Sequence, residues 1–123
     1  MLGAIAPDQV PAQLTSAHIG LAPYTRTGPR YFSPLKLFEY LAAGLAVVAG
    51  DLPGVVDVTA DDHRVVIPAG DAGRLADAVA GLVGDPAQRA ALGRAGRAHV
   101  ARRHTWAHRA ARVTALVREI RAV

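Results

Sequence analysis

The sequence predicts one α/β domain built on a partial Rossmann-like parallel sheet with flanking helices and a helical C-terminus. Two observations carry this prediction. Short apolar segments alternate with helical patterns over residues 1–70, as they do in parallel βαβ units. From residue 71 to residue 123 the pattern is helical throughout. We therefore expect a βα core over residues 1–70 and C-terminal helices over residues 71–123.

The composition is that of a folded domain. With 123 residues, 51% of them hydrophobic and 20% charged, the chain is long enough for one core but short for two ordinary domains. No apolar run reaches the ~18–20 residues that span a bilayer, and residues 1–6 lack the positive charge of a signal peptide. The sequence contains no cysteine, which excludes disulfides and thiolate chemistry. We expect a cytoplasmic location.

The first third of the chain reads as strand, helix, strand and loop. The apolar residues 2–6 are consistent with a short strand, and residues 7–17 with a helix that begins at a proline. Residues 18–22 predict a buried strand that ends at Pro23. Residues 24–33 contain glycine, proline and several polar residues, and we expect a loop there.

The clearest signals come next. Ser33 is a good N-cap, and Pro34 suits the first position of a helix, where the missing N–H costs nothing. Residues 35–43 have a helical pattern, and Gly44 is placed to end that helix. Residues 45–49 are continuously apolar, which is typical of a parallel strand buried on both faces.

The predicted sheet is small. After a helical turn expected over residues 55–59, residues 64–67 supply the last strand. Only about three or four strands are available, which is few for a doubly wound sheet. We therefore expect one sheet edge to need a neighbour, so that the chain is the second half of a larger domain.

Capping signals divide the rest of the chain into helices. Asp71 precedes the first of them. Asp85, followed by a proline and then Gln88, has the spacing of a capping box and begins the second. Residues 105–121 form the third.

The helix that begins near Pro34 has the features of an anion site. Its first N–H groups lack partners within the helix and carry the positive end of the dipole, which suits a phosphate. Lys36 opposes that dipole, and a bound diphosphate would explain its presence. Glu39, about one turn further on, could accept both hydroxyls of a ribose. From the residues alone, a solvated i, i+3 ion pair between Lys36 and Glu39 is an equal alternative.

The stretch from Ser33 to Gly54 resembles the signature of the family 4 (group 1) glycosyltransferases of GT-B fold, and it carries most of the resemblance. Weaker matches follow the family order in the flanks, at residues 3–24, 66–71 and 104–106.

The resemblance implies two Rossmann-like domains, of which the C-terminal one binds a nucleoside-diphosphate sugar. The sugar passes to an acceptor with retention of configuration, and neither a metal nor another cofactor is expected. Glu39 matches the residue that binds ribose, and the backbone around Ser33 matches the diphosphate-binding helix start. An acidic residue at Asp57 also fits the family. The expected donor-binding residues are Tyr31, Phe32, Ser33, Pro34, Leu35, Lys36 and Glu39.

Two departures from the family limit what this chain can do. Tyr31 stands where many members have a glutamate that contacts the transferred sugar. The upstream phosphate-clamping residues and the N-terminal acceptor domain are missing from the sequence. We therefore assign no catalytic residue, leave the acceptor unknown and expect the isolated chain to be inactive. A non-catalytic nucleotide-binding module and an inactive remnant are the alternatives, and a basic lipid- or nucleic-acid-binding domain is a third.

The C-terminal third is strongly basic. Residues 89–121 hold nine arginines and a single acid, Glu119. A solvated helix surface is the simplest interpretation, and peripheral contact with the inner face of a membrane is the alternative. No nucleic-acid motif accompanies the arginines, and no nucleic acid is expected. His104 and His108 have a metal-binding spacing without a third ligand, so we expect no metal. Trp106 is expected to pack the last helix onto the core.

Overall fold

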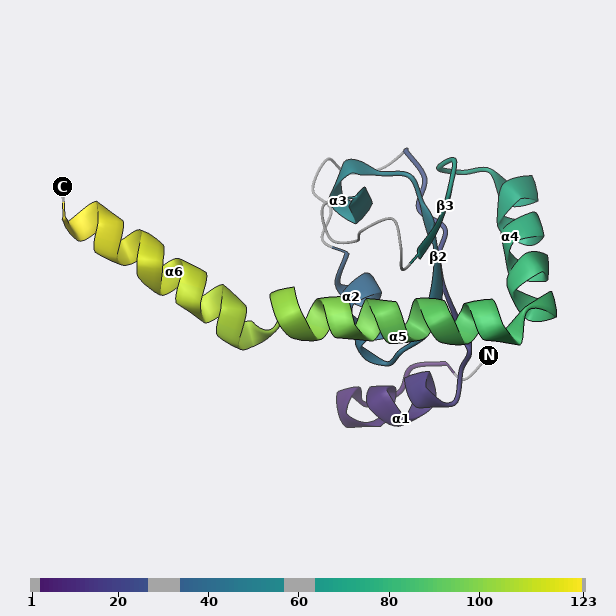
Figure 1. Ribbon diagram of the computed structural model, residues 1–123, viewed down its shortest axis with the longest axis horizontal. Coiled ribbons are helices and arrows are strands. Elements are labelled where there is room, and N and C mark those ends of the chain that lie inside the picture. The colour runs from purple at the N-terminus through teal and green to yellow at the C-terminus, as the bar shows by residue number, and fades with distance from the viewer. Residues whose placement is uncertain (1–2, 27–33, 57–63, 123) are drawn as a thin grey trace.

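The computed structural model describes residues 3–26, 34–56 and 64–122. The elements in chain order (Figure 1) are η1 (Pro7–Gln9), α1 (Val10–Thr15), β1 (Ile19–Ala22), α2 (Leu35–Ala42), β2 (Ala46–Gly50), α3 (Pro53–Val56), β3 (Arg64–Ile67), α4 (Ala72–Gly84), α5 (Pro86–Arg103) and α6 (Trp106–Arg121).

The strands form one parallel sheet in the order β1-β2-β3. Val48 of β2 lies opposite Leu21 of β1 and Val65 of β3. Every residue of β2 is buried, as its continuous apolar sequence predicts for a central parallel strand. The predicted partial Rossmann-like sheet is confirmed.

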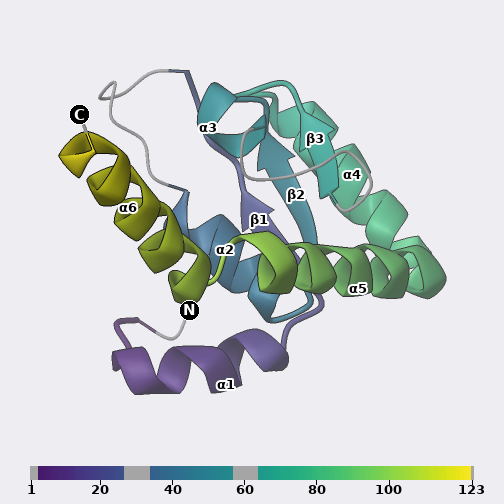
Figure 2. The same cartoon turned by 60° about the vertical axis from the view of Figure 1, so that its left-hand side comes forward.

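Helices cover both faces of the sheet (Figure 2). Val47 and Ala49 of β2 point to one face, where they pack in a cluster with Leu37 and Leu41 of α2. Ala46 and Val48 point to the other face and pack with Leu82 of α4. The long helix α5 contributes to both clusters, through Leu92 on the α4 side and Val100 on the α2 side.

The chain passes from α2 into β2 through a glycine turn. Gly44 has φ +77°, a conformation that favours glycine. The Gly44 N–H donates to the carbonyl of Leu41, and the Leu45 N–H donates to the carbonyl of Tyr40, each at 3.0 Å. This pair of bonds is the Schellman motif, which satisfies two orphan carbonyls at the helix end. The predicted stop at Gly44 is confirmed.

Two aspartates begin the helices that follow the sheet. The carboxylate of Asp71 accepts a hydrogen bond from the Arg74 N–H at 2.9 Å. The carboxylate of Asp85 accepts one from the Gln88 N–H at 2.8 Å. Both N-caps were predicted, because capping depends on residues only three positions apart.

Helix α5 crosses the end of α2 at a glycine pair. A Cβ added to Gly93 would overlap the carbonyl oxygen of Gly44 and would lie 3.0 Å from its carbonyl carbon. The two backbones are therefore in direct contact. This contact fixes α5 against the turn that leads into β2.

Three details of the prediction are wrong. Residues 3–6 form no strand: Gly3 has φ +68°, Pro7 begins η1, and no described strand lies beside this segment. β1 is only half buried, because it lies at the edge of the three-stranded sheet and Leu21 is 40% exposed. α3 begins at Pro53, earlier than the turn expected over 55–59, of which residues 57–59 lie outside the described residues.

None of the helices in the described ranges is long and apolar enough to cross a membrane.

Candidate functional site

Helix α2 begins near the carboxyl end of β1. Tyr24 follows that end of the strand, and the Lys36 ammonium lies 5.1 Å from the centre of its ring. In open parallel sheets this edge is where ligands bind. Such a contact is worth about 0.5–1 kcal/mol at an exposed site, so it leaves Lys36 free to turn toward an anion.

The first turn of α2 differs by one residue from the prediction. Pro34 is the N-cap, with φ −81° and ψ 49°, and no side chain caps the helix there. Its carbonyl accepts a hydrogen bond from the Leu37 N–H at 2.9 Å. Pro34 is buried, while Leu35 is 62% exposed. Assigned helix ends commonly differ by one or two residues, so a shift of one residue in the N-cap is ordinary. Of the remaining predicted site residues, Tyr31, Phe32 and Ser33, together with Asp57, lie outside the described residues.

The carboxyl edge brings together residues that the sequence did not single out. The backbone of Tyr24 lies close to Gly50 at the end of β2. A Cβ added to Gly50 would lie 2.6 Å from the carbonyl oxygen of Tyr24. Burial, and secondly Tyr40, raises the pKa of the Tyr24 phenol, which keeps it a neutral hydrogen-bond donor. Arg26 lies over the same edge, with Nη2 3.9 Å from Oδ2 of Asp51, and both side chains are exposed. A second cation therefore accompanies Lys36.

Glu39 is exposed on the outward side of α2 and lines two grooves. The first, which we call the α1 groove, has a volume of about 410 Å³ and lies between α1, α2 and α5. The second, the α6 groove, has a volume of about 350 Å³ and lies between α2 and the junction of α5 with α6. The α1 groove is lined mainly by apolar side chains, including Pro7, Val10, Leu14 and Ala42.

The Glu39 carboxylate is available for a ligand. Within the described part of the chain, no ion pair or hydrogen bond engages it. The predicted alternative, an ion pair with Lys36, is wrong, because Lys36 lies over the ring of Tyr24 instead. Arg97 lines the α1 groove and Arg109 lines the α6 groove. No sequence pattern identified these two arginines as neighbours of Glu39, because they come from helices far along the chain.

His104 is one of the residues that line the α6 groove. Its ring lies 5.2 Å from that of Phe38, and its Nε2 is 3.1 Å from Nε2 of His99. Burial, followed by the charges of His99 and Arg109, lowers the pKa of His104 and favours its neutral form. The ring of His108 does not join this pair, because its Nδ1 lies 2.6 Å from Thr105 Oγ1.

The expected packing of Trp106 against the core is wrong. Trp106 lines the α6 groove but is 87% exposed, so it does not pack the last helix onto the core. The reason is geometric: the chain changes direction at His104, and α6 extends away from the sheet (Figure 1).

Comparisons with known proteins identify the family of the chain. Residues 1–115 match the family described as Glycosyl transferase-like. The alpha-maltose-1-phosphate synthase of Mycolicibacterium smegmatis is 34% identical over 76% of this chain and 27% of its own length. A GDP-mannose-dependent monoacylated alpha-(1-6)-phosphatidylinositol monomannoside mannosyltransferase of Corynebacterium glutamicum is 35% identical over 55% of this chain and 18% of its own.

Solved structures share the fold. Sucrose-phosphate synthase from Thermosynechococcus elongatus superposes with a TM-score of 0.83 at 26% identity, over 98% of this chain and 30% of that one. The C-terminal domain of a glycosyl transferase group 1 family protein from Francisella tularensis superposes with a TM-score of 0.74 at 19% identity. The match covers 85% of this chain and 53% of that one. This chain spans about a quarter or less of the curated relatives. It belongs to the glycosyl transferase-like family, and its fold is that of the C-terminal domain of GT-B enzymes.

Proposed function

We propose that this chain binds the nucleoside diphosphate part of a nucleotide sugar and supplies that portion of the donor site of a retaining glycosyltransferase. One observation carries the proposal: Glu39 is exposed, has no partner among the described residues and belongs to both grooves beside α2. A carboxylate that is neither paired nor buried suits recognition of two adjacent hydroxyls, as in a ribose.

The spacing along α2 supports the assignment. Helical residues rise 1.5 Å each, so Glu39 lies about 6 Å along the axis from the helix start at Leu35. That is roughly the separation of a ribose from the phosphates attached to it. In this proposal the diphosphate lies at the helix start, beside the N–H groups of Leu35 and Lys36, which have no partner within the helix.

Charge supports the same orientation. The positive end of the α2 dipole, Lys36 and Arg26 all lie at the carboxyl edge of the sheet. In the proposed reaction the bond from the anomeric carbon to the diphosphate breaks, and the diphosphate leaves with the electron pair. Cations placed where that negative charge grows stabilise the transition state. The printed name of the Corynebacterium relative specifies GDP-mannose, which is a donor of this class.

Titration calorimetry of the chain with UDP, GDP and ADP tests the proposal. We expect one of these to bind, and Glu39→Gln to weaken it by about 10-fold to 100-fold, since a hydrogen bond to a charged group is worth about 1.5–3 kcal/mol. Glu119→Gln is the matched control, because Glu119 is the only other glutamate and lies on α6.

A 2′-deoxy nucleotide separates contact with the ribose from a general charge effect. The parent chain should bind the ribonucleotide more tightly than its 2′-deoxy form, and Glu39→Gln should abolish most of that preference. Equal discrimination by the parent and by Glu39→Gln would show that another group holds the ribose, and the assignment of Glu39 would be wrong.

Sugar transfer is proposed to need more chain than these 123 residues. We expect the isolated chain, given a nucleotide sugar and candidate acceptors, to release no nucleoside diphosphate above the rate in buffer. We propose that the acceptor is bound by the further domain that the family resemblance implies, and we place the reaction in the cytoplasm. Release that depends on Glu39 would refute the expected inactivity and would leave the binding proposal standing.

A further inference from the structure

Two histidines face each other at the end of α5. Nε2 of His99 lies 3.1 Å from Nε2 of His104, and the centres of the two rings are 5.0 Å apart. Both side chains are half-buried. Neither histidine takes part in the proposed diphosphate or ribose contacts, so this pair calls for an explanation of its own.

The way in which α5 ends creates the pair. Residues five apart on a continuous helix point about 140° away from each other. His104 is the C-cap of α5, with φ −129° and ψ 24°, so its backbone departs from the helix and its ring returns beside His99. The i, i+4 spacing of His104 and His108 forms no such pair, because the chain passes from α5 into α6 between them.

The two rings are not aligned as a straight hydrogen bond would align them. Each ring centre lies about 1.15 Å behind its nitrogen, so a straight bond of this length would place the centres about 5.4 Å apart. The observed separation of 5.0 Å shows that both rings are bent toward one side of the line between the nitrogens. If the rings converge symmetrically on one atom, that atom lies about 1.9 Å from each Nε2, with an angle of about 110° between the two bonds.

This geometry is that of two imidazole ligands on a tetrahedral metal ion. Zinc bonds to imidazole nitrogen are about 2.0–2.1 Å long, and structural zinc sites are tetrahedral. Nδ1 of His104 has no hydrogen-bond partner among the described residues, so nothing there prevents Nε2 from carrying the lone pair that a metal requires.

The ligands determine which class of metal fits. Imidazole suits Zn²⁺, Ni²⁺ and Cu²⁺, whereas Mg²⁺ and Ca²⁺ prefer oxygen ligands. In the part of the chain that the structure describes, no third histidine or carboxylate completes a set of ligands with this pair. Water therefore has to fill the remaining positions, as it does in sites that keep an open position.

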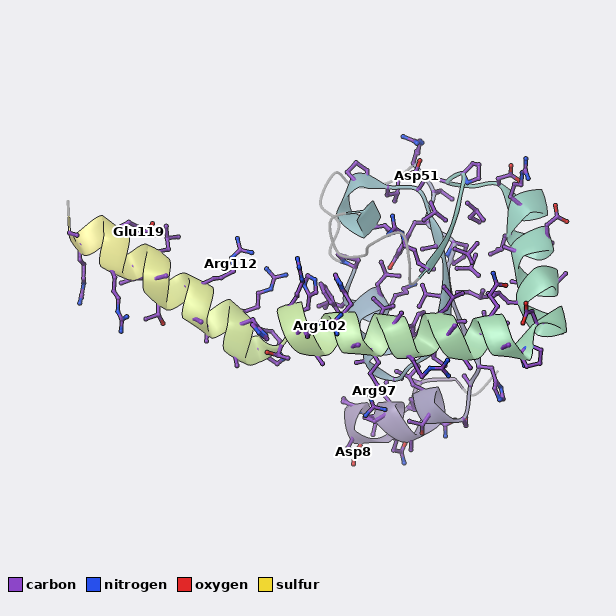
Figure 3. All side chains as sticks on the ribbon, in the orientation of Figure 1. Asp8, Asp51, Arg97, Arg102, Arg112 and Glu119 are labelled. Carbon is purple, nitrogen blue, oxygen red and sulfur yellow. The ribbon has the colours of Figure 1, made fainter. Side chains whose placement is uncertain are left out.

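Positive charge around the junction of α5 with α6 limits the affinity. Figure 3 shows Arg102 on α5 and Arg112 on α6, on the two sides of this junction. Arg109 lines the same groove as His104. Water and salt screen the charges of exposed arginines, so repulsion weakens the binding of a dication without excluding it. We therefore expect an affinity in the micromolar range, below that of a closed zinc site.

We propose that His99 and His104 bind one divalent transition-metal ion of the zinc, nickel or copper class between their Nε2 atoms. The ion joins the C-cap of α5 to its last full turn and so fixes the point at which the chain leaves this helix. The sequence predicted no metal because it paired His104 with His108, whereas the structure supplies His99. The site rests on a contact inside the chain and does not require α6 to be exposed.

Calorimetric titration of the untagged 123-residue chain with Zn²⁺ at neutral pH tests the site. One ion should bind per chain, and Mg²⁺ should produce no binding heat. Zn²⁺ should also raise the Tm by several degrees, because an ion that binds the folded chain stabilises it, and EDTA should reverse this rise.

Replacement of either histidine should remove the site. Loss of a group that only supports a metal ligand costs about 10-fold to 100-fold in affinity, so loss of the ligand itself in His99→Asn should cost about 100-fold or more. His104→Asn should have the same effect, and circular dichroism checks that both variants fold. His18→Asn is the control, because His18 is exposed just before β1, and it should leave Zn²⁺ binding unchanged.

Pulsed EPR with Cu²⁺ counts the imidazole ligands directly. The parent chain should show two bound imidazoles, and His99→Asn should show one. A change in packing alone would not alter this count, so the measurement separates ligation from a structural role of the ring.

Three results would overturn the proposal. The absence of Zn²⁺ binding at millimolar concentration would show that the two rings form a hydrogen bond only. Binding that survives His99→Asn unchanged would place the ion on other histidines. A ratio of one ion to two chains would show an ion that bridges two copies. No nucleotide is present in these titrations, so their outcome leaves the proposed donor site to its own test.

Discussion

Replacing Gly93 with alanine tests the contact that fixes α5 against α2. Without any new contact, alanine at position 93 should stabilise α5 by about 1 kcal/mol relative to glycine, because glycine is a poor helix former. The new methyl group would overlap the Gly44 carbonyl oxygen and would lie 3.7 Å from the Gly44 Cα and 3.0 Å from its carbonyl carbon. The contact cannot be relieved by rotating a side chain, because the position of the alanine Cβ is set by its own backbone and the group it meets is the backbone of Gly44.

The gain in helix propensity and the steric overlap have opposite effects on stability. We expect the destabilisation by the overlap to be the larger. Overpacking of a well-packed interior typically costs about 1–3 kcal/mol, and the upper end applies where a backbone must move. Gly44 is held at φ +77° by the Schellman bonds, so a shift would weaken that turn as well. We therefore expect Gly93→Ala to lower the free energy of unfolding by about 1–2 kcal/mol.

Urea and thermal unfolding followed by circular dichroism measure this change. The expected fall in Tm is about 5 °C, since 1 kcal/mol corresponds to a few degrees in a domain of this size. Gly81→Ala is the matched control: Gly81 lies inside α4 and a Cβ there would meet nothing within 4 Å, so that variant should be stabilised. If both variants are stabilised equally, the glycine contact between α2 and α5 does not exist as described.

Two further predictions concern the helix start of α5 and the histidine at its end. Asp85→Ala should lower the free energy of unfolding by about 1 kcal/mol in urea titrations, because it removes the cap on the Gln88 N–H. Asp77→Ala, an exposed change inside α4, should cause no loss, and equal losses would refute the capping role. Burial lowers the pKa of His104 from 6.5, so the unfolded chain takes up the proton first and stability falls as the pH drops below about 6.5. His104→Asn should flatten that decline in unfolding curves measured at several pH values, and an unchanged slope would show that other groups cause it.

The elements that the sequence predicted well depend on neighbours only a few residues away. Asp71 and Asp85 cap their helices through N–H groups three positions on, and the turn at Gly44 ends α2 through bonds between residues three and five positions apart. The strand at residues 64–67 is matched by β3. Hydrogen bonds and dihedral preferences of this range are encoded locally, so the sequence pattern is sufficient to find them.

The failed predictions needed information from distant residues. Whether residues 3–6 pair as a strand depends on a partner strand, and the described sheet places none beside them. The exposure of Trp106 depends on the direction in which α6 leaves α5, which no local preference determines.

For the candidate site, the sequence alone predicts a helix start suited to phosphate, with Lys36 and Glu39 three residues apart on α2. The surroundings of these two residues follow from the tertiary structure. It separated Lys36 from Glu39, placed Lys36 over Tyr24 and put Arg97 and Arg109 in the two grooves that Glu39 shares. The physical reason is that helix geometry fixes spacing within one element, whereas packing between elements fixes which charges from distant segments meet.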